Sequence, residues 1–265
     1  MTRTPHPHNH PQPGTVTPAQ ALQWLATGWQ LFMKSPGVWL AQSAVFIVIL
    51  AALGFVPFIG WAVTPVALPV LSAGMLSSAL ALERGEALRV GHLFDGLRRH
   101  AGNLLMVGGF HLLGTLLAAL IAAAIGGSAV LTGMLVGAFA GMGMAAGGMM
   151  FGVLVFTVLW SLLMMALWFA PALVMLHDVA PLEAMKLSAQ ACFRNLLTFV
   201  VLAAMLYVLV WVAMLPAGLG MLVLVPVLAG ALLEAWQDTF HARPALPAPT
   251  SAPARAQDDD APPVA

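Results

Sequence analysis

Three long blocks of the chain contain no Asp, Glu, Lys or Arg and consist mainly of apolar residues. These blocks are residues 35–82, 100–177 and 195–233, of 48, 78 and 39 residues. A membrane-spanning helix needs about 20 apolar residues, so the first and third blocks each predict a hairpin of two helices. Pro57 and Pro216 lie between the two helices of those hairpins and favour tight reversals.

The basic residues all lie outside the three blocks. They are Arg3, Lys34, Arg84, Arg89, Arg98, Arg99, Lys186, Arg194, Arg243 and Arg255. If every block crosses the membrane an even number of times, all ten lie on one side, which the positive-inside rule identifies as the cytoplasm. An odd number of crossings in the middle block would place the last four basic residues on the opposite side of the membrane. We therefore expect both termini in the cytoplasm and spans near residues 38–56, 59–82, 103–125, 150–176, 197–215 and 218–236.

Each hairpin follows a segment with amphipathic helical spacing, at residues 18–34, 83–100 and 181–196. In the first segment, Thr17 is the expected N-cap and Pro18 the first helical residue. Its polar face holds Gln20, Gln23, Thr27, Gln30 and Lys34, and its apolar face holds Leu22, Leu25, Trp29 and Phe32. Such a helix is expected to lie in the membrane plane, with its Trp residues at headgroup depth.

The predicted fold class is therefore all-α: a polytopic membrane helical bundle of six transmembrane helices in three hairpins, over residues 18–240. Short matches between the hairpins indicate a threefold internal repeat. Asn103 and Asn195 begin two of the hairpins, and Pro69, Pro171 and Pro226 lie in the second helix of each. Chance similarity in a chain rich in Leu, Pro and Val is the alternative explanation.

The middle hairpin carries an insertion that includes the Gly-rich residues 126–149. Gly133, Gly137 and Gly141 have the spacing that lets two membrane helices approach closely. A plain apolar loop is one interpretation. We prefer the interpretation as a re-entrant or periplasmic interfacial segment, because a single additional crossing would make the number of membrane crossings in this block odd.

The composition places the protein in lipid. Residues of the set AVILMFWYC make up 61% of the chain and charged residues 8%, where soluble domains carry about 25% charged residues. The formal charge is zero and Cys192 is the single cysteine, so a nucleic-acid partner and a disulfide scaffold are excluded. Residues 1–17 and 241–265 are polar and rich in Pro, without a signal peptide, and are predicted to be disordered cytoplasmic tails that contribute nothing to stability.

Four phrases together carry a resemblance to a known family: GWQLFMKSPGVWL (28–40), LERGEALRVGHLFDGLRR (82–99), WFAPALVMLHDVAPLEAMKLSAQACFRNL (168–196) and LPAGLGMLVLVPVLAG (215–230). They resemble an uncharacterised family of bacterial six-helix inner-membrane proteins. More distantly, the layout is similar to the membrane domain attached to some glycerophosphodiester phosphodiesterases. The family supplies no catalytic residues to carry over, and the chain has no phosphodiesterase domain, so that activity is not expected here.

His111 is the candidate functional residue, because it is the ionisable side chain placed well inside a span. Proton relay or ligand binding is one interpretation. The other is a neutral imidazole that is hydrogen-bonded to a backbone carbonyl or to a hydroxyl of a neighbouring helix. The hydroxyls considered are those of Thr64, Ser72, Thr157 and Ser161.

Other groups are weaker candidates for chemistry. His6, His8 and His10 are metal-binding residue types in a Pro-rich tail that does not fix their geometry. The methionines Met142, Met144, Met149 and Met150 suggest Cu(I), but methionine is also an ordinary apolar filler. Asp178, after His177, is expected to cap the helix that follows, and the acidic run 258–260 to be solvated. We therefore predict neither a metal nor a cofactor.

Two classes of function remain. The first is a non-enzymatic protein of the bacterial inner membrane that organises or partners other membrane components within the lipid bilayer. The second is a transporter of small solutes or lipids, which the repeat and the prolines Pro65, Pro69, Pro171 and Pro226 favour. A membrane-embedded hydrolase is disfavoured, because no catalytic motif such as GxSxG or HExxH is present.

Overall fold

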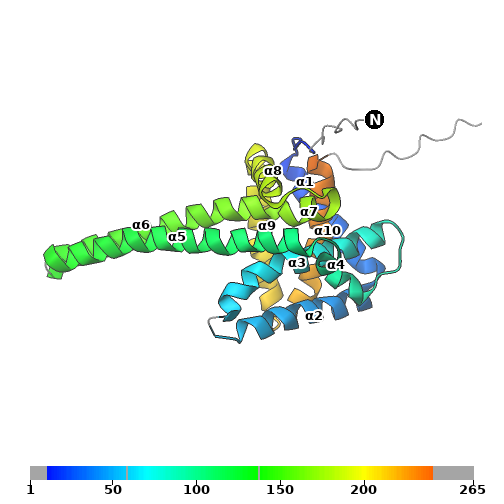
Figure 1. Cartoon of the computed structure of the whole chain (residues 1–265), viewed down its shortest axis with the longest axis horizontal. Coiled ribbons are helices and arrows are strands. Elements are labelled where there is room, and N and C mark those ends of the chain that lie inside the picture. The colour runs from blue at the N-terminus through cyan, green and yellow to red at the C-terminus, as the bar shows by residue number, and fades with distance from the viewer. Residues whose placement is uncertain (1–10, 58, 137, 241–265) are drawn as a thin grey trace, which may run out of the picture.

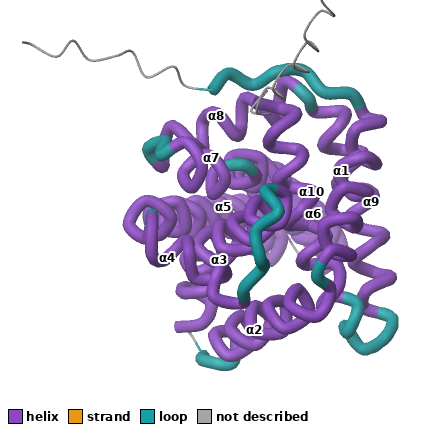
Figure 2. Tube along the Cα trace, turned by 90° about the vertical axis from the view of Figure 1, so that its right-hand side faces the viewer, coloured by secondary structure: helices purple, strands orange, loops and turns teal. Residues whose placement is uncertain are grey.

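The computed structural model describes residues 11–57, 59–136 and 138–240, and every regular element within them is a helix (Figures 1 and 2). Six helices are long and apolar enough to cross a membrane, which confirms the predicted polytopic all-α bundle. They are α2 (Pro36–Gly54), α3 (Ile59–Glu83), α5 (Ala101–Val136), α6 (Ala138–Trp168) continued by α7 (Ala170–His177), α9 (Leu196–Met214) and α10 (Met221–Phe240).

The middle hairpin differs from the prediction. Helices α5 and α6 run without interruption through most of the Gly-rich segment, so it is helical and not a loop. The predicted spans 103–125 and 150–176 are therefore too short. Gly133 lies in α5 and Gly141 in α6, so they do not form a stripe on one helix, and Gly137 lies outside the described residues.

Close packing explains why these glycines do not break the two helices. A Cβ at Gly148 would overlap the Cβ of Ala129, and one at Gly152 would lie 2.9 Å from the carbonyl oxygen of Ala122. The missing side chains let the two backbones touch, and this packing offsets the poor helix propensity of glycine. The result is a hairpin that extends well beyond the other helices (Figure 1).

The amphipathic segments are α1 (Pro18–Lys34), the pair η1 (Val90–Phe94) and α4 (Asp95–Arg99), and α8 (Pro181–Arg194). The first and third are helices as predicted, whereas the second is a broken helix that starts later than expected. In α1 the predicted apolar face is wrong in one respect. Trp24 is fully buried against the bundle, while Leu22 and Trp29 are exposed. Trp24 is therefore a core residue and not a headgroup anchor.

The three units share a backbone signature that supports the internal repeat. A single residue joins each amphipathic segment to its hairpin, namely Ser35, His100 and Asn195. Their φ/ψ angles are similar, at −152°/63°, −134°/32° and −119°/33°. In each case the carbonyl of the joining residue accepts the N–H four residues later. The similar joint at three places favours the repeat over chance similarity of sequence.

The units interlock in a ring. Helix α1 packs on α10, η1 and α4 pack on α3, and α8 packs on α6 and α7. Each amphipathic segment thus lies against the second helix of the preceding unit, with the third unit preceding the first. Two of these contacts need glycine: a Cβ at Gly28 would overlap the carbonyl oxygen of Val227, and one at Gly74 that of Leu93.

The break between α6 and α7 lies at Phe169, two residues before Pro171. The hydroxyl of Ser188 in α8 accepts the N–H of Phe169 at 2.9 Å and donates to the carbonyl of Met165 at 2.7 Å. A regular helix would join those two backbone groups directly. The hydroxyl is therefore inserted into the helical ladder, and it keeps both groups satisfied at the break.

The start of the described chain is not a free tail, so the predicted boundary of disorder at residue 17 is wrong. Gly14 donates its N–H to the carbonyl of Thr239 at 2.6 Å. Asn195 accepts the N–H of Val16 at 2.8 Å and donates to the carbonyl of Gly14 at 2.9 Å, and Thr198 donates to the carbonyl of Val16 at 3.1 Å. Residues 14–16 form a strap across the ends of α9 and α10. The predicted tails at residues 1–10 and 241–265 lie outside the described residues.

Candidate functional site

An apolar cavity of about 450 Å³ lies among the membrane-spanning helices. All six spans contribute to its wall, with α10 contributing most. The wall includes Pro69 and Pro171, two of the prolines that mark the repeat, and three alanines of α10, namely Ala229, Ala231 and Ala235. The cavity is open on one side. It is large enough for a small ligand or part of a larger one.

His111 lines this cavity, and its imidazole interacts with the backbone carbonyl of Pro65. That carbonyl needs a donor because Pro69, four residues later, has no N–H to complete the helical bond. The imidazole of His111, in α5, is placed to supply the hydrogen bond that α3 lacks. A backbone carbonyl is thus the neighbour that the structural interpretation of His111 requires, and the choice between the two interpretations stays a prediction.

The four hydroxyls considered as partners for His111 are used elsewhere. Each donates to a carbonyl of its own helix: Thr64 to Gly60, Ser72 to Pro69, Thr157 to Val153 and Ser161 to Thr157. Ser72 also lines the cavity, so its polar group there is already engaged. The indole N–H of Trp168, in the same wall, is buried without an acceptor among the described residues.

A second, smaller pocket of about 130 Å³ lies between α1, α3 and α10. Its charged residues are Lys34, Glu83 and Glu234. The side-chain amide of Gln237, nearly fully buried, donates to Glu83 at 2.7 Å and joins α10 to α3. The sequence analysis missed this group. The signal was the spacing of Glu234, Gln237 and Asp238, which places three polar residues on one face of a helix.

Asp238 connects the same end of α10 to α1. Its carboxylate accepts the indole N–H of Trp24 at 2.9 Å and the amide of Gln20 at 3.1 Å. Gln20 in turn accepts the N–H of Thr17, the predicted N-cap residue, at 2.7 Å. These contacts hold α1 in place and explain the burial of Trp24, so we assign them to the architecture.

Asp178 does not cap α8, as was predicted. It ends α7 in the left-handed region, with φ of 52°, and the residue before α8 is Ala180. One carboxylate oxygen of Asp178 lies 3.3 Å from Nδ1 of His100. His177 packs its ring 5.1 Å from that of Trp236. The contact between His177 and Trp236 therefore joins the second and third units of the ring, whereas His100 and Asp178 both belong to the second. None of these residues lines the cavity.

The structure offers little for metal chemistry in the part that it describes. Within residues 11–57, 59–136 and 138–240, no three His, Cys, Asp or Glu residues lie close enough to hold a metal ion. Met142, Met144, Met149 and Met150 are exposed side chains of α6. His6, His8, His10 and the acidic run 258–260 lie outside the described residues.

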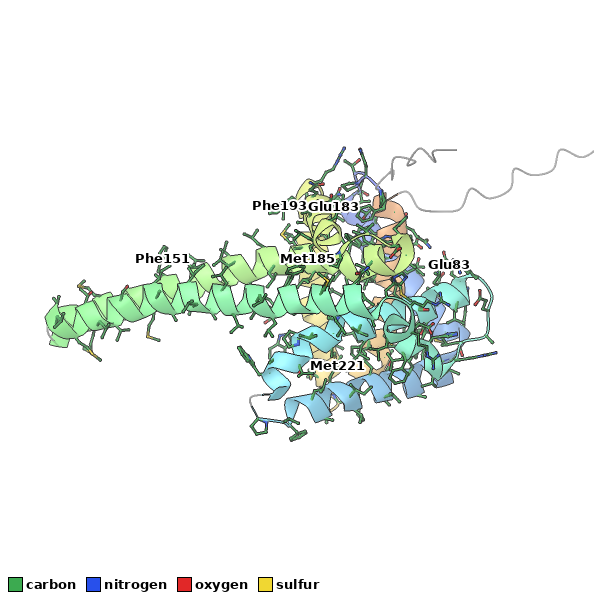
Figure 3. All side chains as sticks on the ribbon, in the orientation of Figure 1. Glu83, Phe151, Glu183, Met185, Phe193 and Met221 are labelled. Atoms are coloured by element: carbon green, nitrogen blue, oxygen red, sulfur yellow. The ribbon has the colours of Figure 1, made fainter. Side chains whose placement is uncertain are left out.

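The distal part of the α5–α6 hairpin, which we call the arm (residues 120–136 and 138–154), is a second candidate site. It lies apart from the other helices, and Phe151 marks its position on α6 (Figures 1 and 3). Its side chains include large exposed apolar groups, among them Leu131, Leu135 and Met150. The arm carries no charged residue. Such a surface suits hydrocarbon or another apolar helix and does not suit water.

Comparison with known proteins finds one informative similarity. The chain is 26% identical over 199 residues to a protein of Burkholderia thailandensis that is named a probable inner membrane protein, and the match covers 72% of each chain. No protein-family model matches the chain, and no solved structure matches it. These comparisons support a bacterial membrane protein. They give no support to the more distant resemblance to the phosphodiesterase-linked membrane domain.

Proposed function

We propose that this chain is a non-enzymatic protein of the bacterial inner membrane that organises other membrane proteins through its helical faces. The name of the similar Burkholderia protein supports the inner membrane as its location. With all basic residues outside the three apolar blocks, the termini are proposed to be cytoplasmic. The observation that carries the organising role is the arm.

The arm is longer than a simple span requires. Helix α5 has 36 residues and is therefore about 54 Å long, against about 30 Å of bilayer hydrocarbon. Hydrophobic mismatch of this size requires strong tilt, local thickening of the bilayer or cover by other helices. The other hairpins have spans of 19–25 residues and need none of these. The extra length therefore suits a contact surface for partner helices.

Photo-crosslinking from the arm tests the proposal. A photoreactive phenylalanine analogue is placed at Leu135 or Met150, and as a control at Leu215, an equally exposed apolar residue in the short α9–α10 turn. We expect discrete protein adducts from the two arm positions and none from the control. A chain that lacks residues 126–149 keeps the ring but shortens the arm. This shortened chain should insert into the membrane with a normal melting temperature, yet fail to complement a strain that lacks the gene. Full restoration by this shortened chain would contradict the proposal.

A lipid or small-solute transporter is the second candidate, and the cavity favours it. Pro69 and Pro171 line this cavity, and helix-interrupting prolines commonly surround the substrate site of a transporter. Against it, the polar groups of His111 and Ser72 in the wall are engaged with helix carbonyls. The His111 variants described in the Discussion separate the two candidates.

A further inference from the structure

We propose that the cavity among the six spans is a binding site for one hydrocarbon chain of a membrane phospholipid. This inference goes beyond the organising role and does not depend on the arm. It starts from the wall of the cavity, which is built from Leu, Met, Phe, Val, Ala and Pro side chains apart from Ser72, His111 and Trp168.

A polar solute is a poor occupant of this cavity. Entry would remove its hydration, and a polar group that is buried in an apolar medium without a hydrogen bond carries a large free-energy cost. The hydroxyl of Ser72 donates to Pro69 at 3.0 Å, and the imidazole of His111 interacts with the carbonyl of Pro65. Both side chains thus interact with the backbone of α3. They are therefore not positioned to replace the lost water of a solute.

A hydrocarbon chain has no polar group to desolvate, so its entry carries none of these free-energy costs. Acyl chains of phospholipids also surround membrane-spanning helices. The lining residues belong to the membrane-spanning helices, and the cavity has an open side. The cavity also differs from the lipid-facing surface of the helices, because Leu202, Ala229 and Ala235 in its wall are buried. The chain of a neighbouring phospholipid can therefore enter while its headgroup stays in the interface.

The experiment uses the full-length protein in bilayers of phosphatidylethanolamine that carries a diazirine midway along one acyl chain. After photolysis, adducts are mapped by mass spectrometry. We expect labelled residues on the inner faces of α3 and α10, where the cavity wall lies. A parallel sample in unlabelled lipid receives the corresponding diazirine fatty acid. Labelling of the wall by the fatty acid but not by the phospholipid would overturn the phospholipid assignment.

Filling the cavity supplies the matched test. Ala229→Phe and Leu206→Trp each place extra volume in the cavity from a different helix, whereas Ala203→Phe adds the same ring as the first on the exposed side of α9. We expect about a tenfold loss of wall labelling in both filling variants and no loss in the control, with melting temperatures at or above wild type. Unchanged wall labelling in a folded filling variant, or labelling confined to exposed residues such as Tyr207, would overturn the proposal.

Discussion

Ser188 completes the backbone hydrogen bonding of Phe169, although the two residues belong to different units of the ring. The hydroxyl lies between the Phe169 N–H and the Met165 carbonyl, and Ser188 and Phe169 are fully buried. Phe169 also packs edge-on against Phe199 and Phe240, with ring centroids 5.6 and 5.5 Å away. This joint therefore connects α7, α8, α9 and α10.

Replacement of Ser188 by Ala should lower stability. It leaves a buried N–H and a buried carbonyl without their common partner, at a cost of about 1–3 kcal/mol. Thermal unfolding of the purified protein in detergent measures the loss. Ser161→Ala is the control, because the Ser161 hydroxyl is exposed and donates only within its own helix, so its effect should stay within about 0.5 kcal/mol. Equal melting of the two variants would show that the bridge at Phe169 adds nothing.

Truncation of the N-terminus should reveal the strap. Removal of residues 1–10 retains every hydrogen bond of Gly14 and Val16, so stability should not change. Removal of residues 1–16 leaves Asn195 and Thr198 without those partners and should cost about 1–3 kcal/mol. Asn195→Ala in the full chain should reproduce much of this loss. If both truncated proteins melt like wild type, the strap does not stabilise the bundle.

His111 tests the choice between structural and transport roles. His111→Gln retains a donor for the Pro65 carbonyl, whereas His111→Leu removes it. If the residue is structural, Gln should behave as wild type, and Leu should lower stability by about 0.6–1.7 kcal/mol, the measured range for interhelical bonds in lipid. Complementation of a deletion strain and thermal melting provide the readouts. A Gln variant that is stable and inserted but inactive would favour the transporter.

The proposed topology is tested by fusions to a reporter that is active only in the periplasm. Fusions after Arg99, Arg194 or Phe240 should be inactive, because the basic residues that flank the spans stay in the cytoplasm. Fusions after Pro57, Gly133 or Ala217 should be active. Immunoblots show that each fusion is made at a similar level. Activity after Phe240 would contradict the six-span topology.

Cys192 provides a reporter of folding that needs no engineering. Burial raises the pKa of its thiol from 9.0 to about 12, and the thiolate is the reactive form. A maleimide at pH 8 should therefore label the unfolded chain and leave the folded one unlabelled. Because the folded state favours the protonated thiol, its contribution to stability is complete below about pH 9 and declines as the pH rises toward 12. Rapid labelling of the folded wild type would show that the α8–α6 contact opens.

Charge spacing was enough to predict most of the fold. The blocks between charged residues locate α2, α3, α9 and α10 to within a few residues, because lipid tolerates few charges in a span. The continuous α5–α6 hairpin could not be predicted in this way. Glycines such as Gly148 and Gly152 look like helix breakers until the partner helix that they touch is known.

Side-chain roles were predicted less well, for a related reason. The orientation of Trp24 depends on Asp238, more than 200 residues away, and no local periodicity contains that partner. The sequence alone did not identify the Pro65 carbonyl, which Pro69 leaves without a helical donor, as the neighbour of His111. Asn195 was noted in the sequence only as the start of a hairpin. Its function as the anchor of residues 14–16 depends on a contact between segments that are far apart in the sequence.

The contact between α1 and α10 also sets an order of events during synthesis. Trp24 leaves the ribosome 214 residues before Asp238, which at about 5–20 residues per second is a delay of roughly 10–40 s. For that time the face of α1 that will meet Val227 has no partner in its own chain, and the ring stays open. Helix α10 begins only at Met221, so a chain that ends before residue 221 lacks the helix that is the main packing partner of α1.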